Sequence, residues 1–263
     1  VNKFLKKGKF NGSISFLITG DEEGLAINGT KKVVDYLKKR REKIDFCIVG
    51  EPTNPNKLGE MIKIGRRGSL SGKIEISGIQ GHVAYPHLSN NPINTLVAIC
   101  KKLKEKKLDK GNKNFQPSNL EFTAINVDNE AHNVIPARAR AQFNVRYNNF
   151  HNAGTLKKKI ELVVKNFCKI NKCKFKLEFI ANGDSFLTKP EKTIFMAKKI
   201  IKKITKITPQ FSTTGGTSDA RFIRKIAPCL EFGLVNKTMH KVDECVSLSD
   251  LKKLTKIYQN ILE

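Results

Sequence analysis

Acidic side chains follow two apolar segments of the chain, where their carboxylates could act on one ligand. Glu22 and Glu23 come shortly after an apolar, β-branched segment at 12–19, and Glu51 comes directly after a second one at 45–50. If both segments are parallel strands of one βαβ unit, their carboxyl ends lie at the sheet edge where open α/β sheets bind ligands. Crowded carboxylates repel one another unless a cation lies between them. The pattern indicates a cation site, although helix capping and solubility also explain such residues singly.

One histidine near the end of the chain could contribute to the same site. His240 lies in a loop after an expected strand at 228–232. A neutral imidazole together with carboxylates is a normal donor set for Zn²⁺. Asp243 or Glu244 could orient the ring as a second layer of contacts. A lone loop histidine is more often an ordinary surface residue, so His240 matters only in combination with the acidic residues.

Other residues are typical of carboxylate recognition. The loop at 213–219 reads Thr-Thr-Gly-Gly-Thr-Ser-Asp and leads into a helix, where glycine allows close backbone approach and the helix N-terminus attracts anions. Arg66, Arg67 and Arg146 carry planar guanidinium groups that match a carboxylate bidentately. His82 is far from the acidic residues in sequence. As a catalytic group it would have to reach across a domain or subunit boundary.

The elements that must position these residues form an α/β domain interrupted by a smaller domain. A helix over about 30–41, with Asn28 as its cap, joins the two apolar segments into a strand-helix-strand unit. The expected elements of the smaller domain are a strand at 69–77, a helix at 91–107, strands at 119–126 and 139–148, a helix at 154–169 and a strand at 174–181. This β-α-β-β-α-β order predicts a ferredoxin-like fold. After residue 190 the pattern returns to helix, strand (228–232) and helix (250–261).

Composition narrows the possible partners. The 263 residues include 49 Lys+Arg and 24 Asp+Glu, a net charge of +25 that first suggests nucleic acid. Most of the basic residues are lysine and the chain has no tryptophan, so the arginines and stacking aromatics of nucleic-acid readers are scarce. For this reason we expect no nucleic-acid partner. We also expect no membrane partner, because no apolar run is long enough to span a bilayer. Six cysteines without a Cys-x-x-Cys pair are typical of reduced thiols and favour a cytoplasmic protein.

Several segments resemble the M20 family of zinc-dependent amidohydrolases and occur in its order. The segments 19–24, 49–52 and 65–70 are similar to the family as a whole, and those at 78–87, 133–136, 186–190, 214–219 and 240–246 resemble one of its members in detail. The resemblance implies a zinc-peptidase-like α/β catalytic domain, with a parallel or mixed sheet and helices on both faces. A ferredoxin-like α+β lid or dimerisation domain would interrupt it. The implied domains are 1–67 and 182–263 for the catalytic domain and 68–181 for the lid.

The resemblance also implies roles for individual residues. Glu22 corresponds to the general base, and His82 to a lid histidine that polarises the amide oxygen in the partner subunit's site. Glu23 and His240 correspond to ligands of one zinc and Glu51 to a ligand of a second, with cobalt as a possible substitute. The implied substrate-binding residues are Arg66, Arg146, His132, Asn133, Gly215, Gly216, Thr217 and Ser218.

The activity implied by the resemblance is zinc-dependent amide hydrolysis by a homodimer. Its expected substrate is the small, carboxylate-rich N-succinyl-LL-2,6-diaminopimelate, split to succinate and LL-2,6-diaminopimelate in lysine biosynthesis. The family's His-x-Asp motif and zinc-bridging aspartate lie upstream of the point that matches Val1, so we expect an inactive C-terminal fragment. His132 also stands where close relatives have an asparagine. Two alternatives stay open: another M20 deacylase or peptidase, such as an acetylornithine deacetylase, or a non-catalytic basic dimerisation module.

Overall fold

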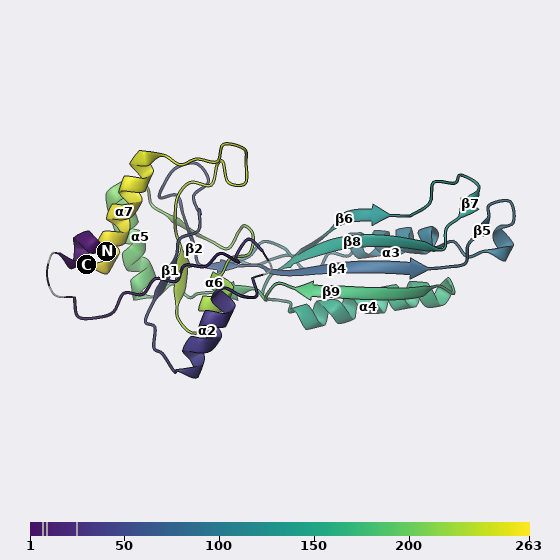
Figure 1. Cartoon of the computed structure of the whole chain (residues 1–263), viewed down its shortest axis with the longest axis horizontal. Coiled ribbons are helices and arrows are strands. Elements are labelled where there is room, and N and C mark those ends of the chain that lie inside the picture. Colours follow the sequence, from purple (N-terminus) through teal and green to yellow (C-terminus); the bar gives the residue numbers. More distant parts are fainter. Residues whose placement is uncertain (7, 9, 25) are drawn as a thin grey trace. The chain divides into compact units, whose positions relative to one another are not determined.

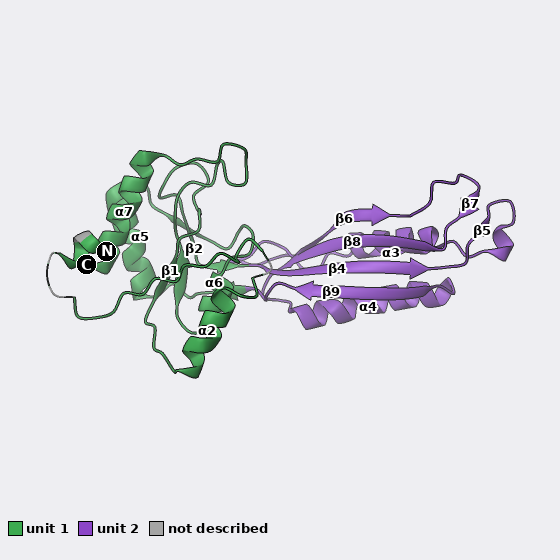
Figure 2. Ribbon diagram, in the orientation of Figure 1, with its two compact units in different colours: residues 1–66, 186–263 green, residues 67–185 purple. Residues whose placement is uncertain are grey.

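The computed structural model describes residues 1–6, 8, 10–24 and 26–263, which divide into two compact units. Unit 1 comprises residues 1–66 and 186–263, and unit 2 comprises residues 67–185 (Figures 1 and 2). The chain thus leaves unit 1 once, completes unit 2, and returns. Because each unit has its own buried apolar core, the two are described separately.

Unit 1 is built on a mixed sheet of four short strands in the order β1-β12-β2-β11. These strands are β1 (Cys47–Val49), β2 (Met61–Lys63), β11 (Gln210–Ser212) and β12 (Cys229–Glu231). β1 runs parallel to β12 and β11 runs parallel to β2, whereas β12 and β2 are antiparallel and pair Glu231 with Lys63. Beside this sheet, β3 (Gly65–Arg66) and β10 (Phe186–Leu187) form a short antiparallel pair.

Helices pack on both faces of this sheet. The longer helices α5 (Lys192–Thr205) and α7 (Leu248–Leu262) share one core with Leu230 and Phe232. The helices α2 (Thr30–Lys39) and α6 (Ala220–Ile223) share another core with Cys229, on the opposite face, since successive strand residues point to opposite faces. A one-turn helix, α1 (Asn2–Leu5), begins the chain. The chain therefore has the mixed α/β architecture that the sequence predicts.

The prediction of a buried strand at 12–19 is wrong. Residues 13–19 form neither a helix nor a strand, and Phe16 and Ile18 are 69% and 90% exposed. β1 pairs with β12 instead, so the strand beside it in the sheet is not the segment that precedes it in the sequence. An apolar, β-branched segment becomes a strand only where another strand supplies backbone partners, and none of the described strands lies beside this one.

Unit 2 has the ferredoxin-like arrangement. Its antiparallel sheet has the order β6-β8-β4-β9, and two long helices share one core with it. The elements are β4 (Gly68–Ser77), α3 (Pro92–Glu105), β6 (Asn119–Asn126), β8 (Arg138–Tyr147), α4 (Ala153–Ile170) and β9 (Lys174–Ala181). Buried residues alternate along β4 and β8, as expected of a sheet covered on one face. A second small pair joins β5 (Gly81–His82), which lies between β4 and α3 in the chain, to β7 (Val134–Ile135), which lies between β6 and β8; η1 (Pro86–Leu88) follows β5.

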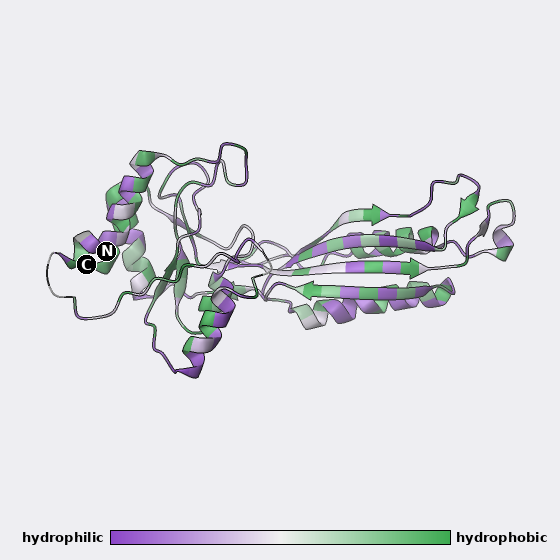
Figure 3. Cartoon of the chain, in the orientation of Figure 1, coloured by the Kyte–Doolittle hydropathy of each residue, from purple (hydrophilic) through white to green (hydrophobic). Residues whose placement is uncertain are grey.

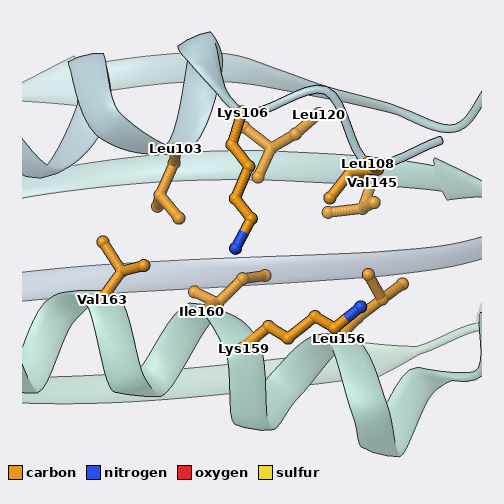
Figure 4. Close-up of a pocket in the computed structure, with 9 residues that line it drawn as sticks. All are labelled: Leu103, Lys106, Leu108, Leu120, Val145, Leu156, Lys159, Ile160 and Val163. Atoms are coloured by element: carbon orange, nitrogen blue, oxygen red, sulfur yellow. The ribbon is translucent and has the colours of Figure 1, made fainter.

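Hydrophobic and hydrophilic residues alternate along the helices of both units (Figure 3). In unit 2 the apolar sides of α3 and α4 line a small hollow, with Leu103, Leu156 and Ile160 on its walls and the stems of Lys106 and Lys159 crossing it (Figure 4). Among the described helices, none combines the length and the apolar character needed to cross a membrane.

Candidate active site

Three acidic residues of the predicted site, the general base Glu22 and the metal ligands Glu23 and Glu51, belong to unit 1. Burial is the main cause that raises the pKa of Glu51, to about 7, and the carboxylates of Glu231, Glu22 and Glu23 raise it further. The carboxylates therefore act electrostatically on Glu51, even though the strand expected before Glu22 is absent.

His240 lies next to one of these carboxylates. Its Nε2 is 3.9 Å from Glu23 Oε1, and its backbone N–H donates a hydrogen bond to Glu244 Oε2 at 3.2 Å. Zinc binds imidazole nitrogen and carboxylate oxygen at about 2 Å each, so a pair at this separation can share one ion. The donor types and the spacing fit zinc. However, the described part of the chain gathers no set of three or more His, Cys, Asp or Glu side chains close enough to hold a metal.

Glu22 has the electrostatic surroundings of a proton acceptor. Its pKa is raised chiefly by burial and then by the carboxylates of Glu23 and Asp219, while Arg221 and Arg66 act in the opposite direction. A general base works best when its pKa is closer to neutral than that of an ordinary carboxylate. The sequence analysis named neither Asp219 nor Arg221 as a site residue. Both could have been considered, because they come within three residues after the Gly-Gly-Thr-Ser segment of the loop.

Arg66 forms a buried ion pair with Glu231. The Arg66 Nε donates to Glu231 Oε1 at 3.1 Å and to Oε2 at 2.9 Å, and Nη2 also donates to Oε2. The remaining terminal nitrogen, Nη1, donates to the carbonyl oxygen of Thr214 at 3.1 Å. Both side chains are almost fully buried. Sequence reasoning missed Glu231. It is the single polar residue at the end of an apolar strand, and it belongs to no recognisable motif.

The glycine-rich loop is attached to this ion pair. Ser218 Oγ donates to Glu231 Oε1 at 2.5 Å. Gly215 has a φ of 107°, which favours glycine, and a side chain there would collide with Arg66 Nη1. Gly215 and Gly216 are exposed and Thr217 is half-buried, so the loop backbone is accessible to a ligand.

Lys63 ties down the start of the same loop. Its Nζ donates to Ser212 Oγ at 3.2 Å and to Thr214 Oγ1 at 2.5 Å. Burial is the main cause that lowers the pKa of Lys63 to about 8, and the neighbouring Arg66 charge lowers it further. Lys63 was not singled out from the sequence, where it is one lysine among many.

Two of the predicted site residues in unit 2 lie side by side. β5 and β7 pair His82 with Val134, and Asn133 Nδ2 is 3.4 Å from His82 Nε2. The backbone N–H of Ala84 donates to His82 Nδ1 at 3.1 Å, so the proton of a neutral ring lies on Nε2. If the Asn133 amide is rotated by half a turn about its Cβ–Cγ bond, its Oδ1 faces His82 and can accept a hydrogen bond from Nε2. In the neutral ring, Nε2 can therefore act as a hydrogen-bond donor. The adjacent His132 is exposed.

The remaining predicted residue, Arg146, also belongs to unit 2. It lies on β8, half-buried, opposite Ser69 of β4 and Asn119 of β6. Arg67, which was also a candidate for binding a carboxylate, donates to Pro117 O and Asn119 Oδ1 instead and so holds the loop before β6. The predicted set therefore divides. Unit 1 contains Glu22, Glu23, Glu51, Arg66, His240 and Gly215 to Ser218, and unit 2 contains His82, His132, Asn133 and Arg146.

This combination of a mixed α/β unit, an inserted ferredoxin-like unit and an acidic site with one histidine defines the class of protein. The model of peptidase family M20/M25/M40 matches residues 1–263, and the chain belongs to this family.

Among its relatives, the chain is 66% identical over 262 residues to the succinyl-diaminopimelate desuccinylase of Pelagibacter ubique, covering all of this chain and 68% of that protein. It is 49% identical over 253 residues to the desuccinylase of Rickettsia bellii, covering 96% of this chain and 65% of that protein. The chain thus spans about two thirds of the length of these curated relatives.

Solved structures with the same fold include aminopeptidase PepT from Bacillus cereus, with a TM-score of 0.74 and 17% identity over 93% of this chain and 61% of that one. A tripeptidase from Staphylococcus aureus has a TM-score of 0.71 and 15% identity, over 87% of this chain and 59% of that one. At this level of identity the likeness concerns the fold alone.

Proposed function

We propose that this chain is the larger part of a hydrolase that cleaves the amide bond of N-succinyl-LL-2,6-diaminopimelate, releasing succinate and LL-2,6-diaminopimelate. The observation that carries the proposal is 66% identity along the whole chain to a protein named as a succinyl-diaminopimelate desuccinylase. The acidic site beside His240 and the anion-binding character of Arg66 and its loop support the same chemistry.

The metal in this proposal is zinc, two ions per active site, with cobalt as a substitute. Glu23 and His240 would hold one ion and Glu51 the other. Bound zinc supplies a Lewis acid that polarises the amide carbonyl and acidifies water. Glu22 accepts the proton of the attacking water and delivers it to the leaving amine, a role that its raised pKa supports.

The substrate's carboxylates would be bound by Arg66, the backbone of Gly215 to Ser218, Arg146, His132 and Asn133. His82, with its proton on Nε2, would donate to the amide oxygen as negative charge develops there, which is an oxyanion-hole role. In the proposed homodimer, formed through residues 68–181, this histidine serves the partner's site. We place the protein in the cytoplasm, because its cysteines are free thiols and the proposed reaction belongs to lysine biosynthesis.

The test is a chimera in which this chain is joined to the part of the Pelagibacter ubique relative that it does not match. We expect zinc-dependent hydrolysis of N-succinyl-LL-2,6-diaminopimelate and much weaker hydrolysis of N-acetylornithine. A chimera that is folded and loaded with zinc but prefers N-acetylornithine, or hydrolyses neither compound, would contradict the proposal.

In the active chimera, Glu22→Gln should reduce kcat by about 10²-fold or more, since it removes the proton acceptor. KM should change little, because the amide keeps the shape of the carboxyl group. Glu42→Gln, an exposed position after α2, is the control and should keep the turnover of the parent. Near-parental turnover in Glu22→Gln would show that another group takes the proton.

A further inference from the structure

Glu231 is the most deeply buried carboxylate in the site of unit 1, with 1% of its surface exposed, and the proposed chemistry gives it no task. We infer that Glu231 is a positioning residue: it orients the Arg66 guanidinium and the Ser218 end of the glycine-rich loop so that together they receive one carboxylate of the substrate. This inference rests on the proposed function for the identity of the substrate. The geometry itself concerns recognition of any carboxylate.

The hydrogen bonds of Arg66 leave a defined part of its guanidinium available. A guanidinium has five N–H groups. Glu231 engages Nε and Nη2, which form the side edge of the fork, and the Thr214 carbonyl takes one N–H of Nη1. The two N–H groups left over belong to Nη1 and Nη2. Two N–H groups of a guanidinium can together hold one carboxylate.

Glu231 also determines what Ser218 can offer. The Ser218 hydroxyl donates its proton to Glu231 Oε1 at 2.5 Å, so it has no proton left for a ligand. An anion at this loop must then be met by backbone N–H groups of the exposed Gly215 and Gly216 and by Arg66. The Gly215 backbone lies directly against Arg66 Nη1, which places these donors next to each other.

Glu231 lies next to two buried cations. Arg66 donates hydrogen bonds to its carboxylate, and Lys63 is its partner in the pairing of β12 with β2. Without Glu231, two adjacent cations would remain in a site with little access to water, and Arg66 would lose the partner that fixes its plane.

A purely structural ion pair would predict something different. Replacing one partner of a buried pair lowers stability in any protein, so loss of stability alone says nothing about positioning. A positioning role requires that carboxylate binding weaken through Arg66. The matched control is Glu75, a carboxylate of unit 2 that accepts a hydrogen bond from Arg140 Nε at 2.7 Å.

The experiment compares Glu231→Gln and Glu75→Gln in the zinc-loaded chimera. We expect Glu231→Gln to raise KM about tenfold or more with kcat changed much less, as for lost uniform binding of the substrate. Glu75→Gln should keep the parental KM. If Glu231 acts through Arg66, its effect should largely vanish in an Arg66→Lys background. A folded Glu231→Gln protein with parental KM, or effects that simply multiply with Arg66→Lys, would overturn the inference.

A second measurement uses the 263-residue chain itself and does not depend on turnover. Succinate, added to isotope-labelled protein, should shift the NMR signals of the Gly215 and Gly216 amides and of the Arg66 side chain, with affinity at least tenfold weaker in Glu231→Gln. If that variant does not fold, Ser218→Ala removes only one bond to Glu231 and should weaken succinate binding to a smaller degree. Unresponsive signals in the parent, or parental affinity in the folded variants, would overturn the inference. An inactive parental chimera with intact succinate binding would contradict only the proposed function.

Discussion

Arg66 and Glu231 are brought together by strand register rather than by any local motif. β12 pairs Glu231 with Lys63 of β2, and Arg66 follows three residues later on β3. The motif residues Glu22, Glu23, Glu51 and His240 could be found from sequence, since each stands in a recognisable segment. Glu231 and Lys63 could not, because their importance depends on which strands become neighbours, and those lie far apart in the chain.

At Gly215, an alanine should destabilise unit 1. The φ of 107° is a conformation that side chains rarely adopt, and the added Cβ would collide with Arg66. We expect Gly215→Ala to lower the free energy of unfolding by about 1–3 kcal/mol in urea denaturation. Gly20→Ala is the control: its Cβ would meet open space, and the change should stay within about 0.5 kcal/mol. Equal stabilities for the two variants would refute the steric argument.

The helices α3 and α4 were predicted to within two residues at each end, whereas the cap predicted for α2 was wrong, because Gly29 and not Asn28 caps that helix. α4 begins with a reciprocal pair of hydrogen bonds between Asn152 and Thr155, and α3 begins with Asn91 as cap and Pro92 in its first turn. The strands β4, β6, β8 and β9 were located within one residue, because one-sided burial leaves a period of two in the sequence. The segment 12–19 failed for the opposite reason, since an apolar run without periodicity depends entirely on its neighbours.

One side chain joins two loop segments of unit 2. Asp109 accepts hydrogen bonds from the backbone N–H of Gly111 at 2.7 Å, Asn148 Nδ2 at 2.6 Å and His151 Nε2 at 3.1 Å, and it also accepts one from the Ser118 N–H. It thus holds the loop before β6 to the segment between β8 and α4. Because every partner is a donor, only the carboxylate form satisfies them all.

Asp109→Asn should therefore lower the stability of unit 2 by about 1–3 kcal/mol, since the new amide would direct N–H groups at other donors. Hydrogen exchange of amides in β8 and α4 measures this loss. Asp128→Asn is the control, because that carboxylate is 77% exposed in its ion pair with Arg140 and should contribute below about 1 kcal/mol. Unchanged protection in Asp109→Asn would show that the cluster contributes no net stability.

The same residue predicts a pH dependence. Burial on its own would raise the pKa of Asp109, but hydrogen bonds from Ser118, Gly111 and Asn148 outweigh it and hold the pKa below its ordinary value. A depressed pKa contributes stability that is complete above the ordinary value and is lost as pH falls through the lowered one. The stability difference between the parent and Asp109→Asn should thus be full at neutral pH and shrink in acid. A difference independent of pH would contradict this account.

At the scale of the whole molecule, the two units differ in how their chains are arranged. Unit 2 is one continuous segment, and all residues of its core lie within it. Unit 1 is discontinuous, and the partners of β1 and β2 in its main sheet come from residues 210–231.

We therefore expect residues 67–185 to fold as an isolated domain, with a dispersed NMR spectrum and a cooperative unfolding transition. Residues 1–66 alone should give a collapsed, unfolded-type spectrum, because their strands lack partners. An isolated 67–185 segment without cooperative unfolding would show that unit 2 needs unit 1 for its stability.

The pairing of Arg66 with Phe186 has a consequence for the order of folding. These two residues face each other on β3 and β10, at the points where the chain leaves unit 1 and returns. If unit 2 were still unfolded, this pairing would have to close a long, flexible loop. Once unit 2 has folded, hydrogen bonds between Ser69 and residues 182 and 183 already hold its two ends together. The entropic cost of closing the loop then falls to that of a short loop. For an effective loop that is tenfold shorter, this cost is lower by about 2 kcal/mol. We therefore expect unit 2 to fold first, because its folding lowers the entropic cost of assembling unit 1 around it.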